Sequence, residues 1–511
     1  MRAWSLYFLV KTGLYYAGYT DFDWTGNLLF AVSLAWPLRW PWARRVRRWL
    51  AWPVALGLFY YDSFLPGPER LLGGLAAISG FSGEYLWELA GRVFDPLLVL
   101  GLLAGVAVYA LLARRVPFAA FAFLGILSVP VAAQFGAEPS ASAETSVISP
   151  AKSPSDPQGR LLAFYQDESR RKLQLPVGEK PAFDLVVLHV CSLAWDDLDV
   201  VNERNHPLFS RFDLMFSNFN TGASYSGPAA LRMLYGACGQ RPQGRLYGGA
   251  PRDCQIFPVL EQAGFRINGL LNHNGAFDDF SKVLEYRGGL RGKIQISRHA
   301  PVYLRSFDGS SIHDDHAALA GWWRQRQGQG NQPVALYYNT ISLHDGNCLP
   351  GQGGCNSLGS YKPRLRKLLN DFDKFINQLE SSGRPVVLVM MPEHGAALRA
   401  GKTQFSGMRE IPGPHVTLVP AAIKLIGLKG QRQSGPLMVE QPTSYFDLNS
   451  LLADLVTDSP YGANARPLSA RLGSVGTTPF VAENEDVVVV RDAADGYLMK
   501  AGQGAWMPYV F

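Results

Sequence analysis

Long apolar stretches dominate the first 136 residues of the chain. Five of them approach the length of about 20 residues that a helix needs to cross a bilayer. They span roughly 4–20, 22–38, 49–65, 94–113 and 117–135. The first carries Lys11 and the second carries Asp23, so the last two give the strongest signal. The pattern predicts a transmembrane domain of about five helices in residues 1–136.

Arginines in the breaks between these stretches predict the orientation of the domain. Arg39 to Arg48 form the sequence RWPWARRVRR before the third stretch, and Arg114–Arg115 separate the fourth from the fifth. Basic loops stay on the cytoplasmic side, so we expect the N-terminus inside and everything after Phe135 outside. No small-residue cleavage site follows Arg2, so no cleavable signal is predicted. Residues 66–92 fit an interfacial helix near the outer leaflet.

Small and polar residues then replace the apolar runs. Residues 137–160 are rich in Ala, Ser and Pro, a composition that predicts a flexible linker. From Leu161 to Phe511, segments with strand-like and helix-like patterns alternate. We therefore expect a second, soluble domain in residues 161–511.

Four apolar runs in this domain are typical of buried strands. They are Asp184–Val190, 265–273, 333–343 and 385–391. Residues 361–383 carry an apolar stripe at helical spacing and end at Gly383, which suits a helix C-cap. Such alternation favours an α/β fold with a mostly parallel sheet covered on both faces. The C-terminal residues 487–510 predict a small antiparallel meander that turns at Asp495–Gly496.

The net charge of +6 and the pI near 8.9 raise the question of nucleic-acid binding. The arginines gather between apolar stretches, however, and the rest of the chain mixes both signs. No basic stripe or groove-reading pattern is present. The charge is therefore attributed to the cytoplasmic flank of a membrane domain, and no nucleic-acid partner is expected.

Five cysteines allow two disulfides and one remaining thiol. Cys238 and Cys254 lie close in sequence, as do Cys348 and Cys355, and all four are in loop-like sequence. If the domain lies in an oxidising compartment, these pairs predict two local disulfides and leave Cys191 unpaired. The alternative is five buried thiols in a cytosolic enzyme, which the predicted topology opposes.

Chemistry-bearing residues gather near the expected strand ends. Cys191 directly follows the strand Asp184–Val190, and Glu393 and His394 follow the run 385–391. Ligands bind at the carboxyl ends of strands in open α/β sheets. A thiolate, a carboxylate and an imidazole could share one Zn²⁺ there. An exposed Glu-His pair in a loop is the alternative for the dipeptide taken alone.

A serine and an arginine are candidates for handling phosphate. Ser226, in YSGPAALRMLY, lies where a helix begins, and a helix N-terminus favours a phosphate group. A serine at a helix start is more often only an N-cap. Arg409, in GMREIPGP, is either a phosphate contact or a solvated surface arginine.

Two histidines also follow expected strands. His344, in SLHDGN, comes after the run 333–343, and we favour proton transfer or phosphate contact over a purely structural role. His273 and Asn274 follow the run 265–273, and for them both readings stay open.

Taken together, these motifs resemble the cellulose phosphoethanolamine transferases, BcsG-type membrane enzymes of the alkaline phosphatase superfamily. The resemblance runs through nearly the whole chain apart from the linker. It is carried by FLVK, FYYDSFLPGPE, CSLAW, NFNTGASYSGPAALR, ACGQ, HNG, FDGS, YYNTISLHDGN, PEHGAALR and REIPGP. It implies a soluble domain with an alkaline-phosphatase-like α/β/α fold.

The resemblance also implies roles for individual residues. The implied zinc ligands are Cys191, Ser226, Glu393 and His394, with Ser226 as the catalytic nucleophile. Tyr225, His344 and Arg409 are implied to surround the phosphoryl group, and His344 also to act in catalysis. Relatives that modify lipid A usually carry an acidic residue where Cys191 stands, Thr as nucleophile and Asp before His-Gly. The Cys, Ser and Glu found here are similar to the cellulose branch.

The implied reaction moves phosphoethanolamine from phosphatidylethanolamine to the 6-hydroxyl of glucose units in nascent cellulose, through a phosphoethanolamine-serine. The implied setting is a bacterial inner membrane, with a periplasmic catalytic domain and subunits of a cellulose synthase complex as partners. Two alternatives remain at this stage. One is a zinc phosphodiesterase or sulfatase that uses water as acceptor, and the other is a membrane scaffold for a polysaccharide synthase.

Overall fold

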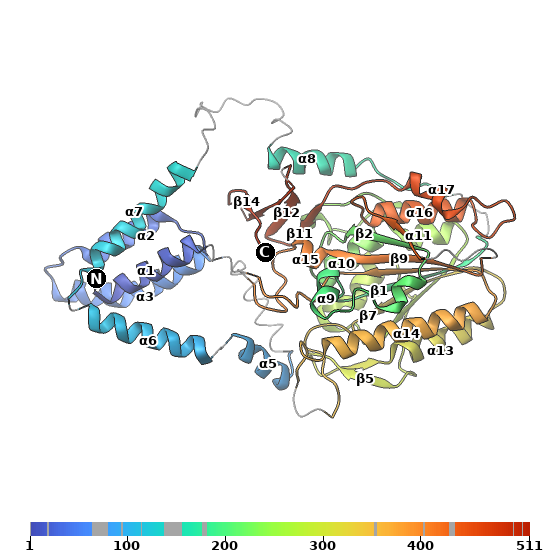
Figure 1. Ribbon diagram of the computed structural model, residues 1–511, viewed down its shortest axis with the longest axis horizontal. Coiled ribbons are helices and arrows are strands. Elements are labelled where there is room, and N and C mark those ends of the chain that lie inside the picture. The colour runs from blue at the N-terminus through green and yellow to red at the C-terminus, as the bar shows by residue number, and fades with distance from the viewer. Residues whose placement is uncertain are drawn as a thin grey trace. The chain divides into compact units, whose positions relative to one another are not determined.

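The computed structural model divides the chain into two compact units (Figure 1). It describes residues 2–17, 20–63, 80–93, 96–113, 115–136, 156–175, 181–351, 355–401, 404–428, 435–493, 495–502 and 504–511. The first unit comprises residues 1–71, 90–150 and 401–403, and the second comprises 72–89, 151–400 and 404–511.

Helices build the described part of the first unit. They are α1 (Arg2–Tyr16), α2 (Trp24–Ala35), α3 (Pro41–Tyr61), α6 (Pro96–Leu112) and α7 (Phe118–Gly136). Each overlaps one of the five apolar stretches. No helix in the described ranges is both long enough and apolar enough to span a bilayer. The transmembrane domain therefore stays a prediction.

The arginine-rich stretch is helical, where a loop was expected. Helix α3 begins at Pro41, so Arg44, Arg45, Arg47 and Arg48 all lie within it. Proline suits the first helical position and arginine is a good helix former. The expectation of a basic loop from 39 to 48 is corrected accordingly.

Lys11 is paired inside the first unit. Its Nζ lies 2.7 Å from Asp62 Oδ2 and donates to Asn27 Oδ1 at 3.0 Å. Both charged side chains are only 1 % exposed. Pairing with hydrogen bonds is what makes a charge in apolar surroundings tolerable. The lysine in the first apolar stretch is therefore compatible with burial among helices.

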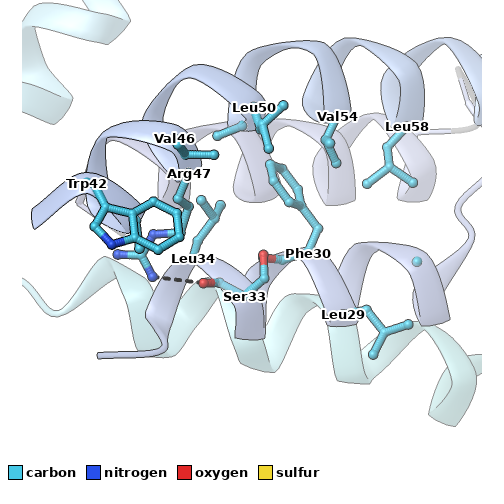
Figure 2. A pocket seen from close by; sticks show the side chains of 13 residues that line it. Leu29, Phe30, Ser33, Leu34, Trp42, Val46, Arg47, Leu50, Val54 and Leu58 are labelled. Carbon is cyan, nitrogen blue, oxygen red and sulfur yellow. Dashed lines mark hydrogen bonds between the residues drawn. The ribbon is translucent and has the colours of Figure 1, made fainter. Parts of the chain in front are cut away.

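An apolar cavity of about 520 Å³ lies between α2 and α3. Figure 2 shows apolar side chains along most of its length, with Trp42 and Arg47 together at one end. Arg47 Nη1 donates to the carbonyl oxygens of Ser33 and Trp36, at 2.9 and 2.6 Å. These carbonyls lie at the C-terminal end of α2, where they have no partner within the helix. The cavity contains none of the predicted site residues.

An eight-stranded sheet forms the centre of the second unit, in the order β10-β2-β9-β8-β1-β7-β3-β4. Its strands are β1 (Asp184–Val190), β2 (Leu214–Asn220), β3 (Arg266–Leu271), β4 (Ile294–Ile296), β7 (Val334–Thr340), β8 (Val386–Pro392), β9 (Leu418–Ile426) and β10 (Leu437–Val439). β9 runs antiparallel to both of its neighbours, and the other pairs are parallel. The predicted mostly parallel sheet is confirmed.

Alternate residues of β1 pack into two hydrophobic cores. Leu185 and Val187 join the core beneath α10 (Ser226–Leu234), α11 (Ile256–Gln262) and α16 (Tyr445–Thr457). Val186 and Leu188 join the core beneath α13 (Asp315–Gln327) and α14 (Tyr361–Ser381). Successive side chains of a strand point to opposite faces, so a continuous apolar run serves both cores. Figure 1 shows the sheet between these two sets of helices.

Shorter elements complete the second unit. They are α8 (Pro157–Glu168), α9 (Trp195–Val200), α12 (Phe280–Lys282), α15 (Pro414–Thr417), α17 (Leu468–Arg471) and a two-stranded sheet of β5 (Val302–Arg305) and β6 (Ser311–His313). The C-terminal sheet is β11 (Val481–Glu483), β12 (Val487–Arg491), β13 (Tyr497–Ala501) and β14 (Met507–Pro508). All its pairs are antiparallel, which confirms the predicted meander.

One segment differs from the sequence expectation, and another contains the expected helix. Pro157 to Arg160, expected as the end of the linker, form the first turn of α8, because Asp156 accepts from Gly159 N at 3.3 Å as an N-cap. The part of the linker from 137 to 155 lies outside the described residues. The segment expected as an interfacial helix contains α5 (Gly83–Val93), whose residues up to 89 belong to the second unit. Residues 64–79 also lie outside the described part.

Both expected disulfides are present in the second unit. Cys238 is bonded to Cys254, and Cys348 to Cys355. Cys191 is the free cysteine and is buried. The predicted pairing of four cysteines, with Cys191 left unpaired, is confirmed.

Replacing both Cys238 and Cys254 by serine should lower the stability of the second unit by about 2–4 kcal/mol, because the bridge closes a short loop in the unfolded chain. Thermal unfolding of the purified chain, with and without reductant, measures the difference. Reductant should lower the unfolding temperature of the wild type more than that of the variant. Equal shifts would contradict a stabilising bridge.

Candidate active site

The carboxyl ends of three neighbouring strands form the floor of the site. Val190 at the end of β1 pairs with Pro392 of β8 on one side and with Thr340 of β7 on the other. The ladder continues past the strand ends: Cys191 N donates to Thr340 O at 2.9 Å, and Glu393 N donates to Val190 O at 2.8 Å. Cys191 and Glu393 are thereby held at the same level of the sheet.

Four side chains converge above this floor. Ser226 Oγ lies 3.3 Å from Cys191 Sγ and 3.2 Å from His394 Nε2. The Cys191 sulfur lies 3.9 Å from His394 Nε2, and Glu393 Oε2 lies 3.8 Å from the same nitrogen. Cys191, Glu393 and His394 are all buried. The residues proposed from the sequence as zinc ligands are thus brought together.

This donor set fits a zinc ion. One ligand atom from each of Cys191, Glu393 and His394 lies within 4.8 Å of the others. Zinc prefers four such donors at about 2.0–2.3 Å in a tetrahedron. Glu393 Oε2 is buried and accepts no hydrogen bond from any residue that the structure describes. A buried carboxylate oxygen without a donor is costly, and a cation among these atoms would satisfy it.

The imidazole of His394 is oriented for ligation. Its Nδ1 lies 2.8 Å from Gly395 O, so Nδ1–H donates to that carbonyl and the Nε2 lone pair faces Cys191 and Ser226. Such a bond fixes the tautomer of a metal-ligating histidine.

The ionisable groups of the site are shifted by burial and by one another. Burial, together with the nearby carboxylate of Glu393, raises the pKa of the Cys191 thiol to about 12. Burial and the charge of Arg409 lower the pKa of His394 to about 3. Burial opposes ionisation of Glu393, but His189 and His394 outweigh it and hold its pKa at about 2. The thiol is therefore protonated on its own, and metal binding would release that proton.

A second set of polar residues holds the other carboxylate oxygen of Glu393, Oε1. Asn339 Nδ2 donates to Glu393 Oε1 at 2.5 Å, and His189 Nδ1 lies 3.3 Å from the same oxygen. His273 Nε2 lies 2.9 Å from Asn339 Oδ1, so His273 supports Glu393 through Asn339. Asn274 is exposed. Sequence reasoning missed His189 and Asn339, although a histidine and an asparagine inside buried strands are signals for them.

Asp197 holds the loop that carries His394. Its buried carboxylate accepts from Ala194 N at 2.9 Å and from Ala396 N at 2.7 Å, and burial raises its pKa to about 7. Gly395 passes so close that an added Cβ would lie 2.7 Å from the Ala194 side chain. Ser192 has a φ of 69°, a conformation that costs free energy for a non-glycine residue. Such strained positions cluster at functional sites.

Ser226 begins α10, as the sequence indicated, and Tyr225 occupies the N-cap position. The N–H groups of Ser226 and Gly227, in the first turn, have no partner within the helix. Tyr225 OH donates to Glu410 Oε1 at 2.5 Å. Glu410 was missed by sequence reasoning, and its position beside Arg409 in the same motif was the available signal.

Arg409 lies at the site and is only 7 % exposed. Its Nη1 donates to Ser192 Oγ at 3.2 Å and lies 3.2 Å from His394 Nδ1, and its guanidinium is 5.5 Å from the Tyr225 ring centroid. The alternative of a solvated surface arginine is therefore wrong.

His344 follows β7 and lies near the same groups. Its Nδ1–H donates to Asp345 O at 2.6 Å, and its ring centroid lies 4.8 Å from that of Phe307. Burial and the charge of Arg409 lower its pKa to about 4. The imidazole is therefore neutral at neutral pH, with Nε2 as its proton acceptor.

Comparison with known proteins shows the family of the chain. One family model, the cellulose biosynthesis protein BcsG C-terminal domain, matches residues 141–506. A second, the BcsG N-terminal domain, matches residues 4–131. The chain belongs to the BcsG family. Two curated BcsG proteins match it over its whole length and over 96 % of their own, at 33 % identity in Escherichia coli K12 and 34 % in Salmonella typhimurium LT2.

A solved structure is also similar to this BcsG-family chain. It is a protein in the alkaline phosphatase superfamily from Vibrio parahaemolyticus, with a TM-score of 0.48 and 15 % identity. The match covers 69 % of this chain and 88 % of that one.

We expect the purified chain to contain zinc, and replacement of Cys191 by Ser to reduce its content well below one ion per chain. A serine hydroxyl is a poorer zinc ligand than a thiolate because it ionises at much higher pH. Elemental analysis by mass spectrometry measures the metal. The double variant Cys238→Ser/Cys254→Ser also removes sulfur but should keep its zinc. Full zinc occupancy in Cys191→Ser would contradict ligation by this thiol.

Proposed function

We propose that this chain is a zinc-dependent phosphoethanolamine transferase that modifies cellulose. The observation that carries the proposal is Ser226, a serine at a helix N-terminus 3.3 Å from Cys191 Sγ and 3.2 Å from His394 Nε2. Membership of a family named for cellulose biosynthesis supports the polysaccharide acceptor. By resemblance, the donor is phosphatidylethanolamine and the acceptor is the 6-hydroxyl of a glucose unit.

The reaction has two steps in this proposal. In the first, Ser226 Oγ forms a bond to phosphorus while the bond to the diacylglycerol oxygen breaks. The serine loses its proton, and the departing diacylglycerol gains one. In the second, the sugar hydroxyl forms a bond to phosphorus, its proton passes to a base, and Ser226 leaves and regains its proton. Zinc bound by Cys191, Glu393 and His394 would lower the pKa of the serine hydroxyl.

Three residues beside Ser226 are assigned supporting roles. Arg409 supplies a positive charge for the phosphoryl oxygens, which carry the charge that develops during transfer. The guanidinium lies 5.5 Å from the ring of Tyr225, the residue before Ser226, and this position supports the assignment. Tyr225, fixed by Glu410, forms part of the phosphoryl pocket. The N–H groups at the start of α10 add a second favourable environment for a phosphate.

His344 is the proposed base for the sugar hydroxyl. A pKa of about 4 leaves it neutral at neutral pH and able to accept a proton. The nearby phosphoryl charge of the intermediate would raise that pKa, because an adjacent negative charge favours the protonated form. The base would thus be strongest when the intermediate is present.

The proposed location is the inner membrane, with the second unit in the periplasm. The two disulfides support an oxidising compartment. The five apolar stretches would then hold the active site close to a lipid donor. Partnership with cellulose synthase subunits is part of the same proposal.

Replacement of Ser226 by Ala should abolish transfer, and replacement of His344 by Ala should slow it by about 10²–10⁴-fold, as is usual when a general base is lost. Mass spectrometry of donor-treated chain measures the adduct on Ser226, and labelled cello-oligosaccharide measures transfer. Ser226→Ala should form no adduct. His344→Ala should still form the adduct but release it slowly.

The exposed Ser210 offers a matched control, and Ser210→Ala should behave as the wild type. An adduct on another residue, or undiminished transfer by Ser226→Ala, would end this mechanism. Release of free phosphoethanolamine at the same rate with and without glycan would instead favour a hydrolase.

A further inference from the structure

A segment from the N-terminal half of the chain contributes to the second unit beside His344. Residues 80–89 include the first turns of α5 and are assigned to the second unit, although about 90 residues separate them from β1. Ser82 N donates to Phe307 O at 2.7 Å. The Phe81 ring lies 5.5 Å from Phe307 and stacks at 6.3 Å on Phe277. The segment is therefore bonded and packed to the catalytic unit.

Tyr85 makes the most specific of these contacts. Its hydroxyl donates to Asp345 Oδ2 at 2.8 Å, and both side chains are 7 % exposed. Its ring also lies against Gly346, where an added Cβ would come within 2.9 Å of it. Gly346 has a φ of 77°, so both the backbone conformation and the close approach require glycine. Tyr85 thus packs directly on the backbone that follows His344 and Asp345.

Ser357 links the other oxygen of Asp345 to Glu88 of the same segment. Ser357 Oγ donates to Asp345 Oδ1 at 2.6 Å. Ser357 N donates to Glu88 Oε1 at 2.9 Å, which ties the same segment to Ser357. Arg364 completes the frame by donating to Ser357 O at 2.7 Å and to His344 O at 3.2 Å. Both oxygens of the Asp345 carboxylate therefore accept a hydrogen bond. Helix α5 supplies one donor directly through Tyr85, and through Glu88 it holds Ser357, which supplies the other.

These contacts determine how His344 is oriented. The Asp345 carbonyl oxygen accepts from His344 Nδ1 at 2.6 Å and so selects the tautomer with Nε2 as acceptor. The Phe307 ring lies against the imidazole, with 4.8 Å between the two ring centroids. The backbone carbonyl of Phe307 accepts from Ser82 N. Both constraints on the imidazole, its tautomer and its plane, thus depend on residues that the 80–89 segment holds.

We propose that Tyr85 is a positioning residue for His344, so that the 80–89 segment completes the half of the site that activates the acceptor. This inference rests on the proposed function, because it concerns the second transfer step. Loss of the Tyr85 hydroxyl would leave a buried carboxylate oxygen without one of its donors, and the loop would shift to find another. The ligands Cys191, Glu393 and His394 make no direct contact with Tyr85 among the described interactions, so the first step depends on it less.

The test compares Tyr85→Phe with the wild type in the full-length chain, purified in detergent. Formation of the Ser226 adduct from phosphatidylethanolamine gives the first-step rate, and its loss on adding cello-oligosaccharide gives the second. We expect the ratio of second-step to first-step rate to fall about tenfold. The control is Trp87→Phe on the same helix, where the side chain is 82 % exposed and both rates should stay as in the wild type.

A double-mutant cycle separates positioning from general destabilisation. In a His344→Ala background, Tyr85→Phe should have almost no further effect on the second step, because the group that it positions is gone. The inference would be overturned if the ratio of second-step to first-step rate stayed unchanged in Tyr85→Phe, whether or not both steps slowed. It would also be overturned if Tyr85→Phe kept its full tenfold effect on the second step in the His344→Ala background. Absence of any Ser226 adduct in the wild type would overturn the proposed function, and the inference with it.

Discussion

The position of β1 between β7 and β8, with the three carboxyl ends level, is the constraint on which the site depends. Backbone bonds extend this register to Cys191 and Glu393. A one-residue shift of β1 would turn its apolar side chains to the opposite faces of the sheet and disturb both cores. Packing energy spread over the two cores therefore fixes the position of Cys191 relative to Glu393. Ser226, at the start of a helix that packs on one of these cores, is aligned by the same packing.

Burial gives the proposed metal site its chemical character. The Cys191 thiol has a pKa of about 12, and the Glu393 carboxylate beside it has a pKa of about 2 and is therefore charged. Without a cation, proton loss from the sulfur is unfavourable. A divalent ion among these atoms reverses that balance, since its charge favours the thiolate and satisfies Glu393 Oε2. Asn339 and His189 hold Glu393, and Asp197 holds the loop of His394, through contacts that do not need an ion.

The sequence was informative wherever the determinant was local. Apolar runs marked β1 and β8, and residues directly after them marked Cys191, Glu393 and His394, because parallel strands end at one edge of a sheet. Determinants that link distant parts of the chain were not visible. Glu410 meets Tyr225 across 185 residues, and Tyr85 meets Asp345 across 260. The antiparallel β9, whose neighbours are set by tertiary packing, was missed for the same reason.

We propose that a sulfur, a carboxylate oxygen and an imidazole nitrogen hold a zinc ion at Ser226. X-ray absorption at the zinc edge of the purified chain tests it most directly, because sulfur scatters differently from nitrogen and oxygen. We expect one sulfur at about 2.3 Å together with nitrogen and oxygen ligands at about 2.0–2.2 Å, and loss of the sulfur contribution in Cys191→Ser. A zinc shell of nitrogen and oxygen alone in the wild type would contradict it.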